Sequence, residues 1–302
     1  MKDKMKIIDC FMYFNEDLIL DLRFNILNKF VDYFVIVESE YTHSGEKKKF
    51  NFDISKYSKY KDKIIYIKIE KKPPNLNEVI DTDNEDKKKK KQLINSLIIE
   101  NYQRNYITNG IKNFADNDLI LISDLDEIPN LSKINFDKIK NKIYLFKQIF
   151  FQYKLDLYLK DFEWFGTKAC LKKNLKSPQW LRNIKNRKYP FYRIDTFLSN
   201  NKYINIEMVE NGGWHFSNIM DEEKIVYKLK SFLHHADIPD NLFDKNLFKK
   251  LIEEKKIMYD HSADKSSRDK FKKVSLSQFD YQLLPEYIKE NKEKFNNWLI
   301  IE

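Results

Sequence analysis

Three acidic side chains follow one short apolar run and carry the strongest chemical signal in the sequence. The run is LILIS, residues 119–123, and Asp124, Asp126 and Glu127 come directly after it. Alternate residues of an extended segment point the same way, so Asp124 and Asp126 can converge on one cation. Carboxylate oxygens suit Mg²⁺ and Mn²⁺. We therefore predict a divalent metal site, holding Mn²⁺ or Mg²⁺, where this segment ends.

Two carboxylates at this spacing also occur in a second class of enzyme. In phosphatases of the haloacid dehalogenase type, the first aspartate of a D-x-D motif attacks phosphorus. That motif normally follows the first strand of its domain and continues with Thr or Val, whereas here it follows the fourth predicted strand and continues with Glu127. A metal-dependent phosphatase or phosphotransferase is therefore the alternative function, and an acidic surface turn is the structural alternative.

A histidine further along the chain is a candidate for completing the metal site. Glycine occurs only five times, yet Gly212 and Gly213 stand together just before Trp214 and His215. Glycine is used where the backbone approaches another group closely or adopts a positive φ. An imidazole nitrogen of His215 could bind the same cation, although a histidine in an apolar strand is more often part of the core.

The hydrophobic pattern of the first half places the acidic motif at the edge of a sheet. Apolar runs predict strands at residues 6–14, 33–38, 64–69 and 119–123, and amphipathic patterns predict helices at 15–30 and 92–114. Fully apolar strands that alternate with helices are typical of a parallel sheet covered on both faces. Ligands of such sheets bind beyond the carboxyl ends of the strands, which is where the acidic motif lies.

The second half of the chain has a different pattern. Strands are predicted at 143–158, 162–171 and 214–216, and helices at 221–234, 242–257 and 285–299. We expect a mixed α+β half that continues the first sheet. Residues 71–91, which include five consecutive lysines at 87–91, are predicted to be a solvated loop.

Composition narrows the class of protein. Of the 302 residues, 42% are hydrophobic and 15% aromatic, which excludes a disordered chain. Cys10 and Cys170 both lie in apolar runs, so we expect buried thiols and no disulfide framework. We find no signal peptide and no integral membrane segment, and we expect a cytoplasmic protein. The net charge is 55 − 46 = +9, but arginine occurs only six times, and we expect no nucleic-acid partner.

Seven segments, taken in order, resemble glycosyltransferase family 17, which includes the enzyme that adds the bisecting N-acetylglucosamine to N-glycans. The segments are IDCFMYFNEDLILDLRFNIL with VDYFVIVESEYTHSG (8–45), ENYQRNYITNGI (100–111), SDLDEIP (123–129), FEWFGTKA (162–169), NGGWHFS (211–217), KLKSFLHH (228–235) and LPEYIKENKEKF (284–295). The resemblance covers most of the chain, and it is weak in the lysine-rich segment and in residues 241–275.

The resemblance implies a fold and a reaction. The fold would be a Rossmann-like, mostly parallel α/β sheet of GT-A type forming a single domain over residues 1–302, with a nucleotide-binding half (1–130) and an acceptor half with C-terminal helices (131–302). The reaction would be an inverting, metal-dependent transfer of a sugar, N-acetylglucosamine, from a UDP-sugar donor to a glycan or glycolipid acceptor. The vertebrate members carry a membrane anchor, and we expect none in this chain.

The resemblance also implies which side chains meet the donor. In GT-A folds the turn after the first strand holds the nucleotide, and a carboxylate that ends the second strand meets the base or ribose. Arg104 could contact a phosphate or hold Asp124 in place, and Glu38 should have a partner because an unpaired buried carboxylate is costly. The residues expected to bind the nucleotide sugar are Asn15, Glu16, Arg23, Glu38, Gln103, Arg104, Asp124 and Trp214.

An inverting transfer needs one base near the acceptor hydroxyl. The candidates are Glu127, Asp237 and Glu163, with Glu127 ranked first because it adjoins the metal motif. The family often has an acidic residue two places after the first histidine of the SFLHH segment; here Ala236 stands there and Asp237 comes next. Trp164 is expected either to stack on a sugar or to pack in the core.

Overall fold

Four apolar segments of the first half pair as parallel strands. In the computed structural model, which describes residues 4–190, 192–232, 243–259 and 273–300, these strands lie in the order β3-β2-β1-β4. Their bounds are Ile7–Met12 for β1, Tyr33–Ser39 for β2, Ile64–Ile69 for β3 and Leu119–Asp124 for β4. The side chains of β1, β2 and β4 are nearly all buried, as expected for strands covered on both faces.

The strands of the second half continue this sheet, as predicted, and make it mixed. The long strand β7 (Leu157–Leu171) runs antiparallel to β4 and to β6 (Ile143–Gln152). The strand β9 (Gly213–Ser217) then pairs with β6 in parallel and with β5 (Glu127–Pro129) in the antiparallel sense. The remaining strands are β8 (Ile206–Val209), β12 (Ser277–Gln278) and the separate pair β10 (Lys256–Ile257) and β11 (Val274–Ser275).

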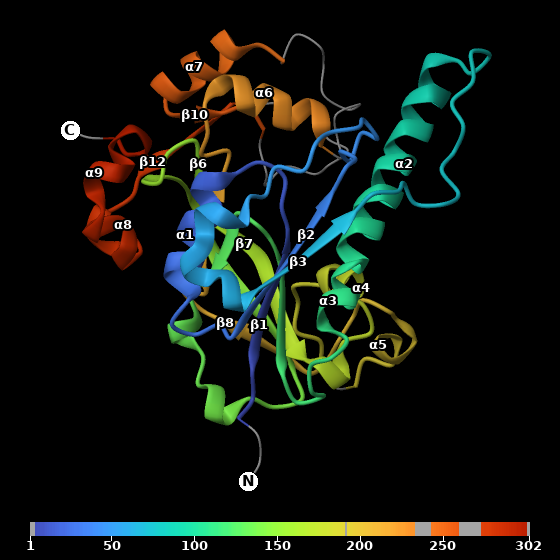
Figure 1. The fold of residues 1–302 in the computed structure, drawn as a ribbon. Helices are drawn as coiled ribbons and strands as arrows, with labels where there is room; N and C mark the ends of the chain where they lie inside the picture. The colour runs from blue at the N-terminus through green and yellow to red at the C-terminus, as the bar shows by residue number, and fades with distance from the viewer. Residues whose placement is uncertain (1–3, 191, 233–242, 260–272, 301–302) are drawn as a thin grey trace.

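Helices cover both faces of the parallel strands (Figure 1). On one face α1 (Asp17–Leu27) contributes Leu20 and Phe24 to the first hydrophobic cluster. On the other face α2 (Glu85–Asn105), α3 (Ile107–Ile111) and α4 (Pro178–Asn183) pack over the second cluster, to which α3 and α4 contribute apolar side chains. Both cysteines are buried there with free thiols, which confirms their prediction as core residues.

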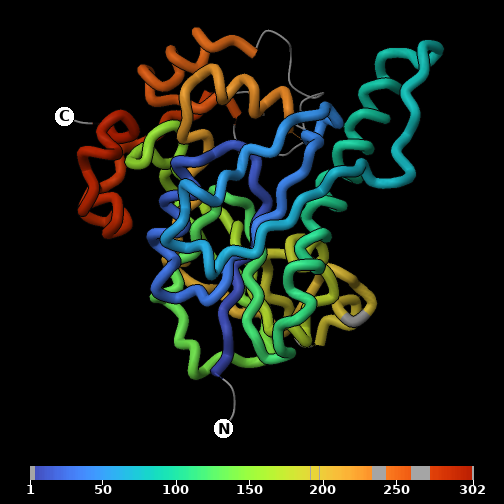
Figure 2. The backbone as a smooth tube through the Cα atoms, in the orientation of Figure 1, coloured from blue at the N-terminus to red at the C-terminus, as the bar shows by residue number. Residues whose placement is uncertain are grey.

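The prediction of a solvated loop over residues 71–91 was wrong from Glu85 onward, because α2 begins seven residues before the predicted helix. The Asn84 side chain accepts a hydrogen bond from the backbone N–H of Lys87 at 2.9 Å and caps the helix. Lys87 and Lys91 then pair with Asp83 at 2.8 and 2.5 Å, so the lysine run is partly neutralised. Figure 2 shows the first turns of α2 projecting beyond the body of the molecule.

The remaining helices belong to the second half of the chain. They are α5 (Asp195–Leu198), α6 (Glu222–Ser231), α7 (Lys245–Glu253), α8 (Glu286–Glu290) and α9 (Lys292–Phe295). The single helix predicted over 285–299 is wrong, because Asn291 has a non-helical backbone (φ −121°, ψ 37°) and its side chain donates to the Tyr287 carbonyl at 2.8 Å. Among the described residues no helix has the length and apolarity needed to cross a bilayer.

Candidate active site

One buried arginine binds the backbone of the acidic segment that follows β4. Arg23, on α1, makes a bidentate pair with Asp9 of β1 at 2.6 and 2.7 Å. Its Nη1 also donates to the backbone carbonyls of Asp124, Leu125 and Glu127 at 2.9 to 3.1 Å. Because Arg23 is 0% exposed, it lies under the site and cannot touch a nucleotide there. The predicted donor contact is therefore replaced by a positioning role.

Two further arginines hold the first aspartate from its sides. Oδ1 of Asp124 lies 3.0 Å from Nη2 of Arg104, and Oδ2 lies 2.9 Å from Nη2 of Arg182. Burial raises the pKa of Asp124, but Arg182 and then Arg104 outweigh burial and bring that pKa down to about 2. The side chain of Asp124 is still 37% exposed. Two roles were predicted for Arg104, and the structure shows its contact with Asp124.

Glu127 has no exposed surface, and this overturns its prediction as the first candidate base. Its side chain is 0% exposed and meets four donors. Arg182 binds both of its oxygens, at 2.7 and 3.0 Å, the indole N–H of Trp164 donates to Oε1 at 2.8 Å, and the backbone N–H of Asp124 donates to Oε2 at 2.8 Å. A carboxylate with every lone pair occupied and no route to solvent cannot accept a proton from an acceptor hydroxyl.

The second aspartate faces a histidine and a lysine. Oδ1 of Asp126 lies 3.4 Å from Nε2 of His215, and Oδ2 lies 3.3 Å from Nζ of Lys228 on α6. Nζ of Lys228 also pairs with Glu16 at 2.9 Å. Burial raises the pKa of Asp126, but Lys228 and then His215 hold that pKa well below its usual range. The structure thus brings Glu16, Asp126 and His215 together around Lys228 and Asp126.

The ring of His215 is fixed by aromatic neighbours. Phe150 meets it edge-on, with ring centroids 4.9 Å apart, and Trp164 lies 4.7 Å away at an interplanar angle of 31°. Nδ1 of His215 is buried and has no hydrogen-bond partner among the described residues, and the same is true of Oδ1 of Asn15. His215 therefore directs Nε2 at Asp126 while its other nitrogen is unsatisfied, which is an unusual state for a residue that only fills the core.

Glycines allow the strands of the site to approach one another. Gly213 has a φ of +132°, and a Cβ on it would lie 2.2 Å from the Ile128 carbonyl oxygen of the neighbouring strand β5. A Cβ on Gly166 would lie 2.2 Å from Oε1 of Gln148 and 2.6 Å from Cδ of Glu127. No other residue type fits at either position. The close approach predicted for the glycine pair is confirmed.

Three predicted donor-binding residues serve the protein interior instead. Glu38 is 1% exposed and accepts hydrogen bonds from Lys48, from two backbone N–H groups and from the Tyr66 hydroxyl. The carboxylate therefore has the partner that was predicted for it, but these four donors occupy its oxygens. The Gln103 side chain donates to the Tyr41 carbonyl at 2.8 Å. Trp214 precedes His215 on β9, therefore points to the opposite face, and packs on the first hydrophobic cluster.

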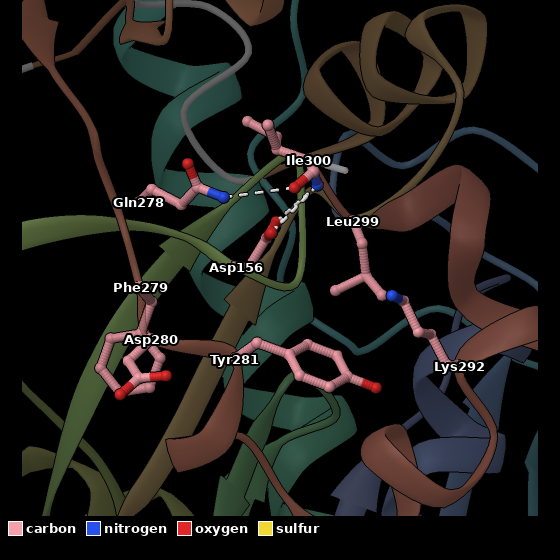
Figure 3. A pocket seen from close by; sticks show the side chains of 8 residues that line it. All are labelled: Asp156, Gln278, Phe279, Asp280, Tyr281, Lys292, Leu299 and Ile300. Atoms are coloured by element: carbon pink, nitrogen blue, oxygen red, sulfur yellow. Dashed lines mark hydrogen bonds between the residues drawn. The ribbon is translucent and has the colours of Figure 1, made fainter. Parts of the chain in front are cut away.

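The other base candidates and a pocket near the C-terminal segment lie away from the acidic motif. Glu163 precedes Trp164 on β7, is 54% exposed and pairs with Lys147, while Asp237 is outside the described residues. A pocket of about 550 Å³ is lined by residues of the C-terminal segment together with Asp156, and none of the predicted site residues lines it. Figure 3 shows the Asp156 carboxylate there, bound to the backbone N–H of Ile300 at 2.9 and 3.0 Å.

Sequence reasoning missed Arg182 and Lys228, two cations that pair with acidic side chains of the motif. Arg182 lies on the short helix α4, and a buried lysine binds the end of that helix: Nζ of Lys168 donates to the carbonyls of Arg182 and of the C-cap residue Ile184 at 2.7 and 2.5 Å. Burial, and then the charge of Arg182, lower the pKa of Lys168 to about 7. The scarcity of arginine was the available signal, since three of the six arginines, Arg23, Arg104 and Arg182, surround the motif.

The donor set around Asp126 suits a hard divalent cation. An aspartate oxygen and an imidazole nitrogen face each other at 3.4 Å; carboxylate oxygens bind Mg²⁺ and Mn²⁺, and imidazole nitrogens bind transition-metal ions. Asp124 adds a partly exposed carboxylate two residues earlier. The described residues contain no group of three His, Cys, Asp or Glu side chains already arranged around one point, and arginine and lysine carry the positive charge next to both aspartates.

The model of the family "Glycosyltransferase family 17" matches residues 1–300, which is nearly every residue and includes both aspartates, Arg182, His215 and Lys228. No protein among those with curated functions matches the chain.

Proposed function

Because the chain belongs to glycosyltransferase family 17, we propose that it transfers N-acetylglucosamine from UDP-N-acetylglucosamine to a glycan or glycolipid acceptor, with inversion at the anomeric carbon. That it is a glycosyltransferase follows from the family. The donor, the inversion and the acceptor class are the proposed parts, and a GT-A type of fold is proposed with them.

The observation that carries the proposal is the pair of ionised aspartates at the carboxyl end of β4. Asp124 and Asp126 are the side chains of the motif that remain accessible, at 37% and 13% exposure, and neighbouring cations keep both ionised. They lie where ligands of parallel sheets bind. The strand order β3-β2-β1-β4 supports a nucleotide-binding sheet.

We assign Mn²⁺ or Mg²⁺ to Asp124, Asp126 and His215. When bound, such an ion would neutralise the charge that develops on the leaving diphosphate. The side chains of the protein have separate roles: Arg104 and Arg182 orient the Asp124 carboxylate, and Lys228 orients Asp126 and supplies a positive charge within reach of an anionic ligand.

Asp237 is the proposed catalytic base. This proposal is supported by the exclusion of the other two candidates. Glu127 is enclosed by four donors, and Glu163 points to the other side of β7 and pairs with Lys147. The Asp237→Asn variant should lose transfer while it keeps UDP binding, since a base acts on the acceptor and not on the donor. Loss of UDP binding in that variant, or full activity, would remove Asp237 from this role.

The function is tested with the unmodified chain, UDP and UDP-N-acetylglucosamine. UDP should raise the melting temperature when Mn²⁺ is present and have little effect in chelator, and slow hydrolysis of the donor should release UDP. Stabilisation by UDP that chelator leaves intact would contradict the metal assignment. The alternative function makes the opposite forecast: a phosphatase would hydrolyse p-nitrophenyl phosphate and would be indifferent to UDP.

A further inference from the structure

The most exposed large apolar side chains of the described residues lie together in one segment. Tyr192, Ile194 and Leu198 are 69%, 76% and 87% exposed. They belong to the connection between α4 and β8 that contains α5, and Figure 1 shows α5 beside α4 at the edge of the molecule. Apolar side chains that are this exposed and this close in sequence mark a surface that meets another apolar phase.

Basic side chains accompany this apolar group. Lys185, Arg187 and Lys188 are exposed, and the ion pairs made by the described residues do not involve them. Over residues 185–203 the sequence has five basic residues and one acidic residue, a net charge of 5 − 1 = +4. The patch therefore complements a negatively charged partner. We call the six side chains Lys185, Arg187, Lys188, Tyr192, Ile194 and Leu198 the basic–apolar patch.

The segment is tied to the body of the protein at several points, so its exposure belongs to the fold. The indole N–H of Trp180 donates to the Asn200 carbonyl at 2.8 Å, and the backbone N–H of Lys185 donates to the Asn201 carbonyl at 2.8 Å. The one acid, Asp195, is neutralised by Arg193 and Lys202 at 2.7 and 2.6 Å. That neutralisation removes the only charge of the segment that an anionic partner would repel.

We propose that the basic–apolar patch docks the protein on an anionic phospholipid bilayer. Ile194 and Leu198 would enter the boundary between headgroups and acyl chains, Tyr192 would lie at headgroup level, and the basic side chains would bind lipid phosphates. Nucleic acid fits less well, because isoleucine and leucine cannot stack on bases. The helix α4, which carries Arg182 of the candidate site, adjoins the patch. This inference does not depend on the proposed reaction.

Co-sedimentation with vesicles tests the proposal on the unmodified chain. Binding is expected to vesicles that contain phosphatidylglycerol, not to vesicles of phosphatidylcholine alone, and it should weaken as NaCl is raised. Replacing Arg187 and Lys188 by Gln should weaken the partition about fivefold for each charge removed. Replacing Ile194 and Leu198 by Ser should weaken it at least about tenfold, without a change in melting temperature, since both side chains are exposed in the free protein.

The matched control is Leu283→Ser, which removes a side chain that is 64% exposed and lies in the C-terminal segment. It should bind vesicles like the unmodified chain. Equal binding to neutral and anionic vesicles, no binding to either, or unaltered binding by the Ile194→Ser/Leu198→Ser variant would overturn the proposal. So would an oligonucleotide that binds the patch more tightly than the vesicles do.

Discussion

Nζ of Lys228 lies 3.3 Å from Oδ2 of Asp126, on the carboxylate whose other oxygen faces a histidine. A lysine in this position keeps Asp126 ionised in a site from which water is largely excluded. It also gives a metal ion a competitor, because a cation that binds both oxygens of Asp126 must displace the ammonium group. Lys228 would then retain Glu16 as its partner.

Replacing Asp126 by Asn should lower transfer by about a hundredfold or more and abolish Mn²⁺-dependent binding of UDP. The reason is that the variant loses the charge that both the metal and Lys228 require, while the similar size of the side chain preserves the packing. Donor turnover and titration calorimetry with and without Mn²⁺ measure the two effects. Asp83→Asn, which also removes an acid with two lysine partners, should leave both unchanged. Normal UDP binding by the Asp126 variant would be incompatible with the assigned site.

His215→Phe separates a metal ligand from a packing residue. Phenylalanine keeps the ring between Phe150 and Trp164, so stability should stay within about 1.5 kcal/mol of the unmodified protein, but it removes Nε2. We expect Mn²⁺-dependent UDP binding to weaken at least about tenfold. Calorimetry with Mn²⁺ and a thermal melt of the same sample give both numbers. If the affinity were unaltered while stability fell, His215 would be a core residue only.

Arg182→Ala should destabilise the fold strongly, because it leaves the enclosed Glu127 carboxylate without its cation. Breaking a buried pair by removing one partner costs about 3–5 kcal/mol. Arg182→Lys keeps the charge but not the bidentate geometry. Its free energy of unfolding should lie between those of Arg182→Ala and the unmodified protein. Urea unfolding measures the difference. Arg193→Ala, which removes an exposed arginine that also pairs with an aspartate, should cost about 0–1 kcal/mol; a similar loss from both variants would argue against the enclosed network.

Lys168 should make stability rise with pH above neutrality. Its pKa in the folded protein is lowered to about 7 by burial and by Arg182, whereas a lysine in the unfolded chain titrates near about 10.4. Between these values the unfolded state binds more protons, so the free energy of unfolding rises with pH, and this contribution is lost as the pH falls through about 7. The neutral amine still donates to the carbonyls of Arg182 and Ile184.

Urea unfolding at several pH values from neutral to alkaline checks this forecast. The free energy of unfolding of the unmodified protein should rise with pH more steeply than that of Lys168→Met, by up to about 1.4 kcal/mol per pH unit. Lys188→Met, which removes an exposed lysine, should keep the slope of the unmodified protein. Parallel curves for the chain and its Lys168→Met variant would mean that Lys168 remains charged in the folded state.

The sequence predicted the parallel strands and the place of the acidic motif because both depend on local patterns. An apolar run of strand length such as LILIS, bounded by polar residues, favours a buried strand over a helix. It did not predict the environment of Glu127, because Trp164, Arg182 and the Asp124 N–H reach that carboxylate from separate elements. Local pattern also failed at Asn84 and Asn291, where a single side chain decides whether a helix begins or breaks.

The contacts of Arg23 set an order of events for the growing polypeptide. Its aspartate partner, Asp9, is synthesised first, but the three carbonyls that it binds come about a hundred residues later. On the ribosome, α1 and β1 can therefore associate early, while Arg23 keeps unsatisfied N–H groups until β4 has emerged. Nascent chains that stop before residue 128 should consequently be far more sensitive to protease around α1 than chains long enough to include α4.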